Sequence, residues 1–137
     1  MVLLITMGAS RADAEDATQE AMIRAWQRWE SIDKPEAWVR TVAVRAYWRM
    51  VNARPQTAPF NEPVPESTAD PSLSIFTEEQ QHVLRLLRAL PPMQCNVAAL
   101  TYDGSTCGEI AILLGISEAT VRSHLRHARK NLKGMML

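Results

Sequence analysis

The apolar positions near the C-terminus recur with a helical period on both sides of Gly115. Such a glycine accommodates the positive φ that ends a helix, and Ser117 is an N-cap residue type for a second helix with Glu118 in its first turn. Ala111 is small enough to let the two helices approach closely. The second helix is predicted to bury one stripe, formed by Val121, Leu125, Ala128 and Leu132. The stripe is expected to pack against Ile110, Leu113 and Leu114. We therefore predict a helix–turn–helix over residues 106–133.

Helical spacing also predicts two helices in the N-terminal half of the chain. One begins at Asp13 or Asp16 and ends near Glu30, and Trp26 and Trp29 on it are expected in the core. Its inner stripe is predicted to comprise Ala17, Ala21, Ile23 or Arg24, Ala25 and Trp29, widened by Met22 and Trp26. The next begins at Pro35, a residue type favoured in a first helical turn, and continues through Trp38, Val42, Ala46 and Met50, which recur at every fourth position.

Residues 1–7 form the end of a further helix that stops at Gly8, and their apolar side chains require a packing partner. Between the two halves, residues 55–76 hold five of the eight prolines and no Lys or Arg, which predicts a flexible, mildly acidic linker. Thr77 is an N-cap for a helix ended by Pro91, with an inner face predicted to comprise Val83, Leu84, Leu87 and Leu90. A helix over residues 93–101 follows, and Asp103-Gly104 forms a turn.

No segment alternates as a strand does, so the predicted fold is all-α with two small helical domains. Their predicted boundaries are residues 1–54 and 77–137, joined by the linker over residues 55–76.

Composition narrows the possible functions. The 137 residues carry 15 Lys and Arg against 15 Asp and Glu, so any contact with nucleic acid must come from local patches. No apolar run approaches the ~20 residues that a membrane helix needs, so no membrane insertion is expected. Cys95 and Cys107 lack a Cys-x-x-Cys spacing and are expected to be reduced thiols, although a disulfide between them remains possible. The three histidines have no acid or cysteine at metal-ligand spacing, so we expect no metal, no cofactor and no enzyme.

The second helix of the predicted helix–turn–helix carries a strongly basic face. Residues 117–133 hold five Lys and Arg against one acid, although the net charge of the whole chain is zero. A local positive face of this kind is typical of a helix that lies against DNA phosphates, and the alternative is a solvated basic face. The residues opposite the apolar stripe are Arg122, Ser123, His124, Arg126, His127, Arg129 and Lys130.

The helix that begins at Pro35 combines arginines with aromatic residues. Unstacked bases of a single strand lie on flat aromatic faces, whereas a duplex needs only cations and hydrogen-bond donors. Trp48, between Tyr47 and Arg49, fits the core and a nucleic-acid contact equally well. The candidate residues for nucleic-acid binding on this helix are Arg40, Arg45, Tyr47, Trp48 and Arg49.

Two motifs together resemble the extracytoplasmic-function sigma factors, the smallest class of the sigma-70 family. DAEDATQEAMIRAWQRW with KPEAWVRTVAV is similar to the second conserved domain of the family, and the segment from LPPMQCNVAAL to RSHLRHARKNL is similar to the fourth. The resemblance implies a cytoplasmic protein that binds core RNA polymerase, promoter DNA and an anti-sigma factor.

The resemblance also implies roles for single residues. Asp16, Gln19 and Glu20 would face the clamp helices of the polymerase. Arg45, Tyr47, Trp48 and Arg49, with Arg40 nearby, would engage the −10 element. Arg122, Ser123, Arg126 and His127 would enter the major groove at the −35 element, where Arg is the usual reader of guanine. Arg129 and Lys130 would hold phosphates, which fix the register of the complex.

The sequence departs from the family pattern at three places. Only residues 1–7 remain of the helix that precedes the acidic segment, so either the chain is part of a longer one or the domain is shortened. Arg45 stands where an Asn is frequent, and His127 where an Arg is common. Two alternative interpretations are a LuxR-type helix–turn–helix regulator, which Thr120, Val121 and His124 also fit, and a sigma-like interaction protein that does not initiate transcription.

Overall fold

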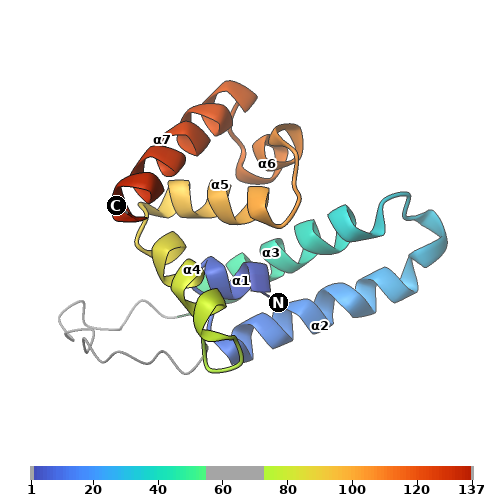
Figure 1. Cartoon of the computed structure of the whole chain (residues 1–137). Helices are drawn as coiled ribbons and strands as arrows, with labels where there is room; N and C mark the ends of the chain where they lie inside the picture. Colours follow the sequence, from blue (N-terminus) through green and yellow to red (C-terminus); the bar gives the residue numbers. More distant parts are fainter. Residues whose placement is uncertain (1, 55–72, 137) are drawn as a thin grey trace. The chain divides into compact units, whose positions relative to one another are not determined.

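A computed structural model of the chain describes residues 2–54 and 73–136 (Figure 1). Every regular element in these residues is a helix, which confirms the predicted all-α fold. The elements are α1 (Val2–Thr6), α2 (Arg11–Gln27), the 3-10 helix η1 (Trp29–Ser31), α3 (Pro35–Ala53), α4 (Glu78–Arg88), α5 (Pro92–Tyr102), α6 (Cys107–Leu114) and α7 (Glu118–Met136). The predicted linker falls mostly on residues 55–72, which lie outside the described residues.

The helices group into two compact units. Of the described residues, 10–54 and 73–76 belong to one unit, and 2–9 together with 77–136 belong to the other. The predicted boundaries at 1–54 and 77–137 remain a prediction, but the packing groups residues 1–9 with the C-terminal half. We call the two units the α2–α3 unit and the C-terminal unit.

The α2–α3 unit is built on small side chains. Ala14, Ala17, Ala21 and Ala25 follow one another at helical spacing on α2 and are at most 3% exposed. On α3, the buried residues are Ala43, Val44 and Ala46. Alanines at these positions let the two helices approach closely, and α2 and α3 lie side by side along most of their length in Figure 1.

The expectation that Trp26 and Trp29 belong to the core is wrong. Trp26 is 85% exposed and Trp29 59% exposed, and Met22 and Ile23 also face solvent. Trp26 follows Ala25 directly, which places it about 100° further round the helix and away from α3. The buried residues of α2 are the four alanines of this stripe, and the larger apolar residues do not widen it.

The start of α2 also differs from the prediction, because the helix begins at Arg11 and not at Asp13 or Asp16. Ser10 is the N-cap, and its Oγ accepts a hydrogen bond of 3.1 Å from the Asp13 backbone N–H. A serine hydroxyl satisfies a free N–H of the first turn, which fixes the boundary two residues earlier.

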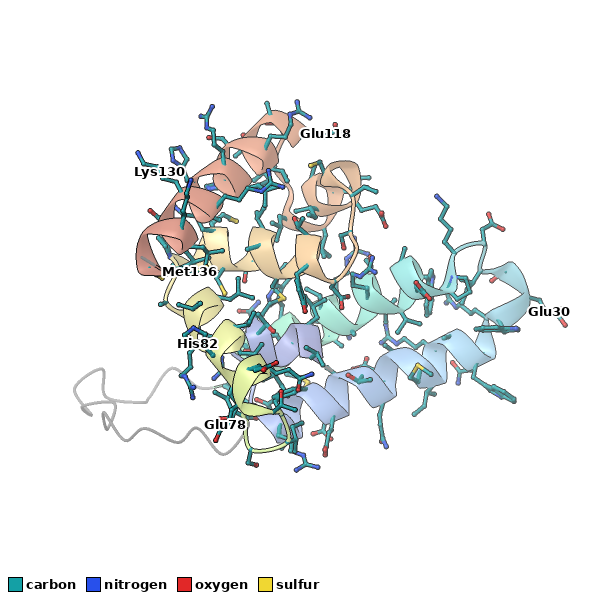
Figure 2. The ribbon with its side chains drawn as sticks, viewed as in Figure 1. Glu30, Glu78, His82, Glu118, Lys130 and Met136 are labelled. Atoms are coloured by element: carbon teal, nitrogen blue, oxygen red, sulfur yellow. The ribbon has the colours of Figure 1, made fainter. Side chains whose placement is uncertain are left out.

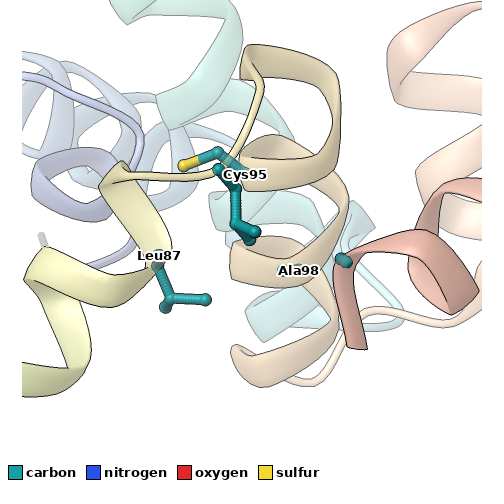
Figure 3. Close-up of a cluster of buried hydrophobic side chains, with 5 residues drawn as sticks. Leu87, Cys95 and Ala98 are labelled. Atoms are coloured by element: carbon teal, nitrogen blue, oxygen red, sulfur yellow. The ribbon is translucent and has the colours of Figure 1, made fainter. Parts of the chain in front are cut away.

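The core of the C-terminal unit joins α4, α5 and α7. Leu87 of α4 faces Cys95 and Ala98 of α5, as Figure 3 shows, and Leu90 and Ala128 complete the cluster. Burial raises the pKa of the Cys95 thiol, and both cysteines are free thiols.

On α4, the predicted inner face holds at three of its four positions. Leu84, Leu87 and Leu90 are buried, whereas Val83 is 42% exposed and the expectation for it is wrong. The Thr77 N-cap is part of a capping box with Gln80, as two hydrogen bonds of 3.0 and 3.2 Å show.

The apolar N-terminal segment finds its partner in the C-terminal unit. Leu3, Leu4 and Ile5 of α1 are at most 7% exposed. The guanidinium of Arg88 donates two hydrogen bonds, of 3.1 and 2.6 Å, to the Ile5 carbonyl oxygen. The Cys95 Sγ lies 3.5 Å from the Thr6 carbonyl oxygen. The Arg88 bonds add to the one that the Ile5 carbonyl accepts from the Gly8 N–H, at the C-terminal end of a short helix where carbonyls lack intrahelical partners.

Candidate nucleic-acid interface

The helix–turn–helix is formed by α6 and α7, and local hydrogen bonds define the start of α6 and the turn between the two helices. At the start of α6, Thr106 and Glu109 form a capping box, with each backbone N–H donating to the other side chain at 3.2 Å. At its end, Gly115 has φ 70° and donates its N–H to the Ala111 carbonyl. Ser117 then caps α7, because its Oγ accepts a 3.1 Å hydrogen bond from the Thr120 N–H. The turn is therefore defined by glycine and capping chemistry, as the sequence predicted.

One side of α7 is buried and the other carries the cations. Val121 and Ala128 are fully buried, as is Ile110 on α6, while Leu125 and Leu132 are half-buried. Five of the seven predicted −35 residues are exposed: Arg122, Arg126, His127, Arg129 and Lys130. Ser123 and His124 are half-buried, so they lie at the edge of this basic face.

Contacts with α5 hold α7 in place beneath its basic face. The Asn131 side-chain amide donates a 2.7 Å hydrogen bond to the Gln94 Oε1. Ala128 lies in the same cluster as Ala98 of α5, with Leu132 packed against it. Figure 2 shows Glu118 at the start of α7 and Lys130 further along on its outer side. A rigid helix with an exposed cationic side is suited to enter a DNA groove.

The second candidate surface lies on α3 in the α2–α3 unit. Arg45 and Arg49 are exposed, and Arg40, Tyr47 and Trp48 are half-buried. Trp48 as a whole is half-buried, which lies between the two alternatives that the sequence left open.

The structure brings together two residues that the sequence assigned to different surfaces. Glu20, a predicted polymerase contact, lies 3.2 Å from the Arg49 guanidinium and 2.8 Å from that of Arg24. The other two predicted polymerase contacts, Asp16 and Gln19, are exposed on α2. The acidic side of α2 therefore meets the basic side of α3 at Glu20.

A second ion pair joins the same two helices and was not predicted from the sequence. An Arg54 guanidinium nitrogen lies 2.5 Å from an Asp13 carboxylate oxygen. This hydrogen bond lowers the pKa of Asp13 and raises that of Arg54. The two residues are 41 positions apart in sequence, and only the α2–α3 pairing brings them together.

The exposed aromatic residues at the end of α2 form a further feature that the sequence interpretation missed. Trp26 and Trp29 line an open hollow together with the intervening and following residues up to Ser31. The sequence contained a signal for the exposure of these tryptophans. Four alanines recur at helical spacing on α2 and are enough for a close contact with another helix, so the tryptophans are not needed in that contact.

Residues 2–54 and 73–136 contain no group of three or more His, Cys, Asp or Glu side chains placed to hold a metal ion. Within the same ranges, each helix is too short or too polar to cross a membrane.

Comparison with protein families gives two matches that cover most of the chain. Residues 3–54 match Sigma-70 region 2, and residues 80–132 match Sigma-70, region 4. The region 2 match includes α1, which the packing groups with the C-terminal unit.

Three curated relatives illustrate the similarity. The chain is 34% identical to the ECF RNA polymerase sigma factor SigL of Mycobacterium tuberculosis, over 89% of this chain and 73% of that one. It is 30% identical to the RNA polymerase sigma-E factor of Streptomyces coelicolor, over 88% of this chain and 70% of that one. The "Probable RNA polymerase sigma factor RfaY" of Xanthomonas campestris is 32% identical over 92% of this chain, which spans only 34% of that relative.

Two solved structures share the fold. The sigma factor RpoE in complex with the anti-sigma factor NepR from Bartonella quintana superposes with a TM-score of 0.72, at 20% identity, over 98% of this chain and 87% of that one. CnrH in complex with the cytosolic domain of CnrY gives a TM-score of 0.60 at 21% identity, over 96% of this chain and 75% of that one.

Proposed function

The chain belongs to the sigma-70 family of RNA polymerase sigma factors, and we propose that it is an alternative sigma factor of the extracytoplasmic-function type. It binds core RNA polymerase and directs transcription to promoters that carry matching −10 and −35 elements. Sigma factors are DNA-binding regulators, and in this proposal the polymerase performs the chemistry.

One observation carries the proposal, namely that region 2 and region 4 occur in a single chain whose region 4 has a helix–turn–helix with an exposed basic helix. A LuxR-type regulator has a similar output helix but requires a different N-terminal half. The match of residues 3–54 to region 2 stands against that alternative.

The C-terminal unit supplies the −35 contacts through α7. Arg122, Ser123, His124, Arg126 and His127 lie toward the start and middle of the helix, where a recognition helix contacts base edges. Arg129 and Lys130 are further along on the exposed side and bind phosphates, which set the register.

The α2–α3 unit supplies the −10 and polymerase contacts. Arg45 and Arg49 are the exposed cations of α3, with Arg40, Tyr47 and Trp48 around them as the donors and flat faces for an opened strand. Asp16 and Gln19 of α2 face the polymerase, and Glu20 is shared between this surface and Arg49.

The remaining partners follow from the family. An anti-sigma factor is proposed as the regulator, since the RpoE structure is that of a sigma factor bound to one. The protein acts in the cytoplasm, where the polymerase and the promoter are found.

Run-off transcription with purified core polymerase tests the proposal. A sigma factor confers initiation at a specific promoter by itself, whereas an activator of the LuxR type requires another sigma factor. If the chain binds core polymerase but opens no promoter in a genomic fragment library, it is an interaction protein, and the proposed function is wrong.

A further inference from the structure

We propose that Glu118 orients the guanidinium of Arg122 for base contact and is thereby a specificity-determining residue of −35 recognition. The inference rests on the proposed function of α7 and assigns Glu118 a positioning role within it, without a base contact of its own.

The first observation is the ion pair at the start of α7. An oxygen of the Glu118 carboxylate (Oε2) lies 3.6 Å from the Arg122 Nη1, one helical turn away. The two side chains are 58% and 60% exposed. An exposed pair of this kind adds little to the stability of a fold. In the proposal, the pair acts instead by limiting the directions that the long Arg122 side chain adopts before DNA arrives.

The second observation concerns the other carboxylate oxygen of Glu118. A Cβ built on Gly108, in the first turn of α6, would lie 3.1 Å from the Glu118 Oε1 and 3.9 Å from the Thr106 Oγ1. Oε1 thus occupies the space beside Gly108 that a longer side chain would fill, while Oε2 faces Arg122. Carboxylates are favoured near the first turn of a helix, where backbone N–H groups point outward.

This arrangement also gives a reason for a glycine within a helix. Glycine is less favourable than alanine in a helix interior, and Gly108 does not have the positive φ that would require it. What it provides is room for the Glu118 carboxylate. Gly108, Glu118 and Arg122 therefore form one structural unit that spans both helices of the motif.

The consequence for DNA is that an oriented arginine discriminates better than a free one. Arg reads guanine through two parallel hydrogen bonds whose geometry is fixed by the planar guanidinium. A side chain already held near that direction loses less rotamer freedom when the bonds form. The carboxylate also repels phosphates, so it lowers the affinity for every DNA sequence. Its effect on Arg122 raises the preference for the correct sequence over the others.

The test compares four variants of the chain bound to core polymerase, on promoters in which each −35 position is varied in turn. Glu118→Gln removes the charge of the positioning carboxylate, and Gly108→Ala displaces the carboxylate but keeps its charge. Glu78→Gln is the matched control, because Glu78 is also an exposed acid in the first turn of a helix, α4, outside the motif (Figure 2). Arg122→Ala identifies the position that Arg122 reads.

We expect Glu118→Gln to reduce discrimination at the Arg122 position by roughly 3- to 10-fold, a part of what one bidentate base contact provides. The same variant binds non-specific duplex more tightly, since a negative charge is lost. Gly108→Ala reduces discrimination at the same position and leaves non-specific binding unchanged. Glu78→Gln changes the preference at no −35 position.

Unchanged discrimination in both Glu118→Gln and Gly108→Ala would overturn the proposal while wild-type discrimination still supports the proposed function. A change at a position other than that of Arg122 would show that Glu118 reads a base itself, which also overturns it. If the wild-type chain shows no −35 preference at all, the proposed function fails together with this inference.

Discussion

Replacing Gly115 with alanine isolates the backbone contribution of the helix–turn–helix corner. Gly115 has φ 70° and ψ 33°, and a Cβ at this position would meet no atom within 4 Å. The cost is therefore conformational and not steric. Left-handed backbone costs a non-glycine residue ~1–2 kcal/mol, and the smaller freedom of the unfolded chain offsets part of it. We expect Gly115→Ala to lower the free energy of unfolding of the C-terminal unit by about 1 kcal/mol.

The matched control is Gly134→Ala near the end of α7. A Cβ there also meets no atom within 4 Å, but Gly134 does not have a positive φ. Helix propensity then predicts a gain of up to ~1 kcal/mol, opposite in sign to the effect at Gly115. Urea unfolding followed by circular dichroism measures both variants. All four tryptophans lie between residues 26 and 48, so their fluorescence follows the α2–α3 unit and should not shift. Equal signs for the two variants would refute the reasoning.

Three further predictions concern charge, packing and DNA. Arg54→Ala removes the hydrogen bond that lowers the pKa of Asp13, so the Asp13 carboxyl of the variant should titrate closer to 3.8 by NMR. A carboxyl whose pKa is lowered in the folded state stabilises the fold above the pKa of the unfolded state. The wild type should therefore lose more stability than the variant as the pH falls below 3.8. Ala128→Leu places extra volume into a fully buried site and should cost ~1–3 kcal/mol in urea unfolding, whereas no loss would show that the cluster around Leu87 has spare room. In promoter-binding titrations, Arg126→Ala should reduce the binding free energy by on the order of 1–3 kcal/mol and relax the base preference at one −35 position. Lys130→Ala should weaken binding to all sequences alike and reduce the slope of the salt dependence by about one unit. Equal effects of both variants on every sequence would show that the base-reading residue is misassigned.

The helix–turn–helix was predictable because its signals are local and agree with one another. Gly115 ends one helix, Ser117 begins the next, and the stripe through Val121 and Ala128 has the period of a helix. Each of these features depends on residues only a few positions apart, so the sequence contains all the information that the local fold needs.

The features that the sequence did not predict depend on contacts between distant residues. The size and apolar character of Trp26 and Trp29 suggested that they are core residues. The buried face of α2 is instead formed by its alanines, and both tryptophans are exposed. The pairing of Arg54 with Asp13 and of Arg49 with Glu20 requires the register of two helices, which no local pattern specifies.

The packing of the N-terminal segment shows the same limit. The sequence indicated that residues 1–7 need a partner but could not identify it. The structure places α1 against α4 and α5, where Arg88 bonds to the Ile5 carbonyl. The assignment of the exposed residues to −10, −35 and polymerase contacts remains a proposal, because it depends on partners and not on the packing of the chain itself.

Footprinting of the polymerase reconstituted with this chain tests the central claim most directly. On a promoter that the holoenzyme transcribes, the account predicts protection of both the −10 and the −35 elements, with the −35 protection lost selectively in the combined Arg122→Ala and Arg126→Ala variant. Protection of a single element in the wild type, or loss of both elements together in that variant, would contradict the claim that the two units contact separate promoter elements.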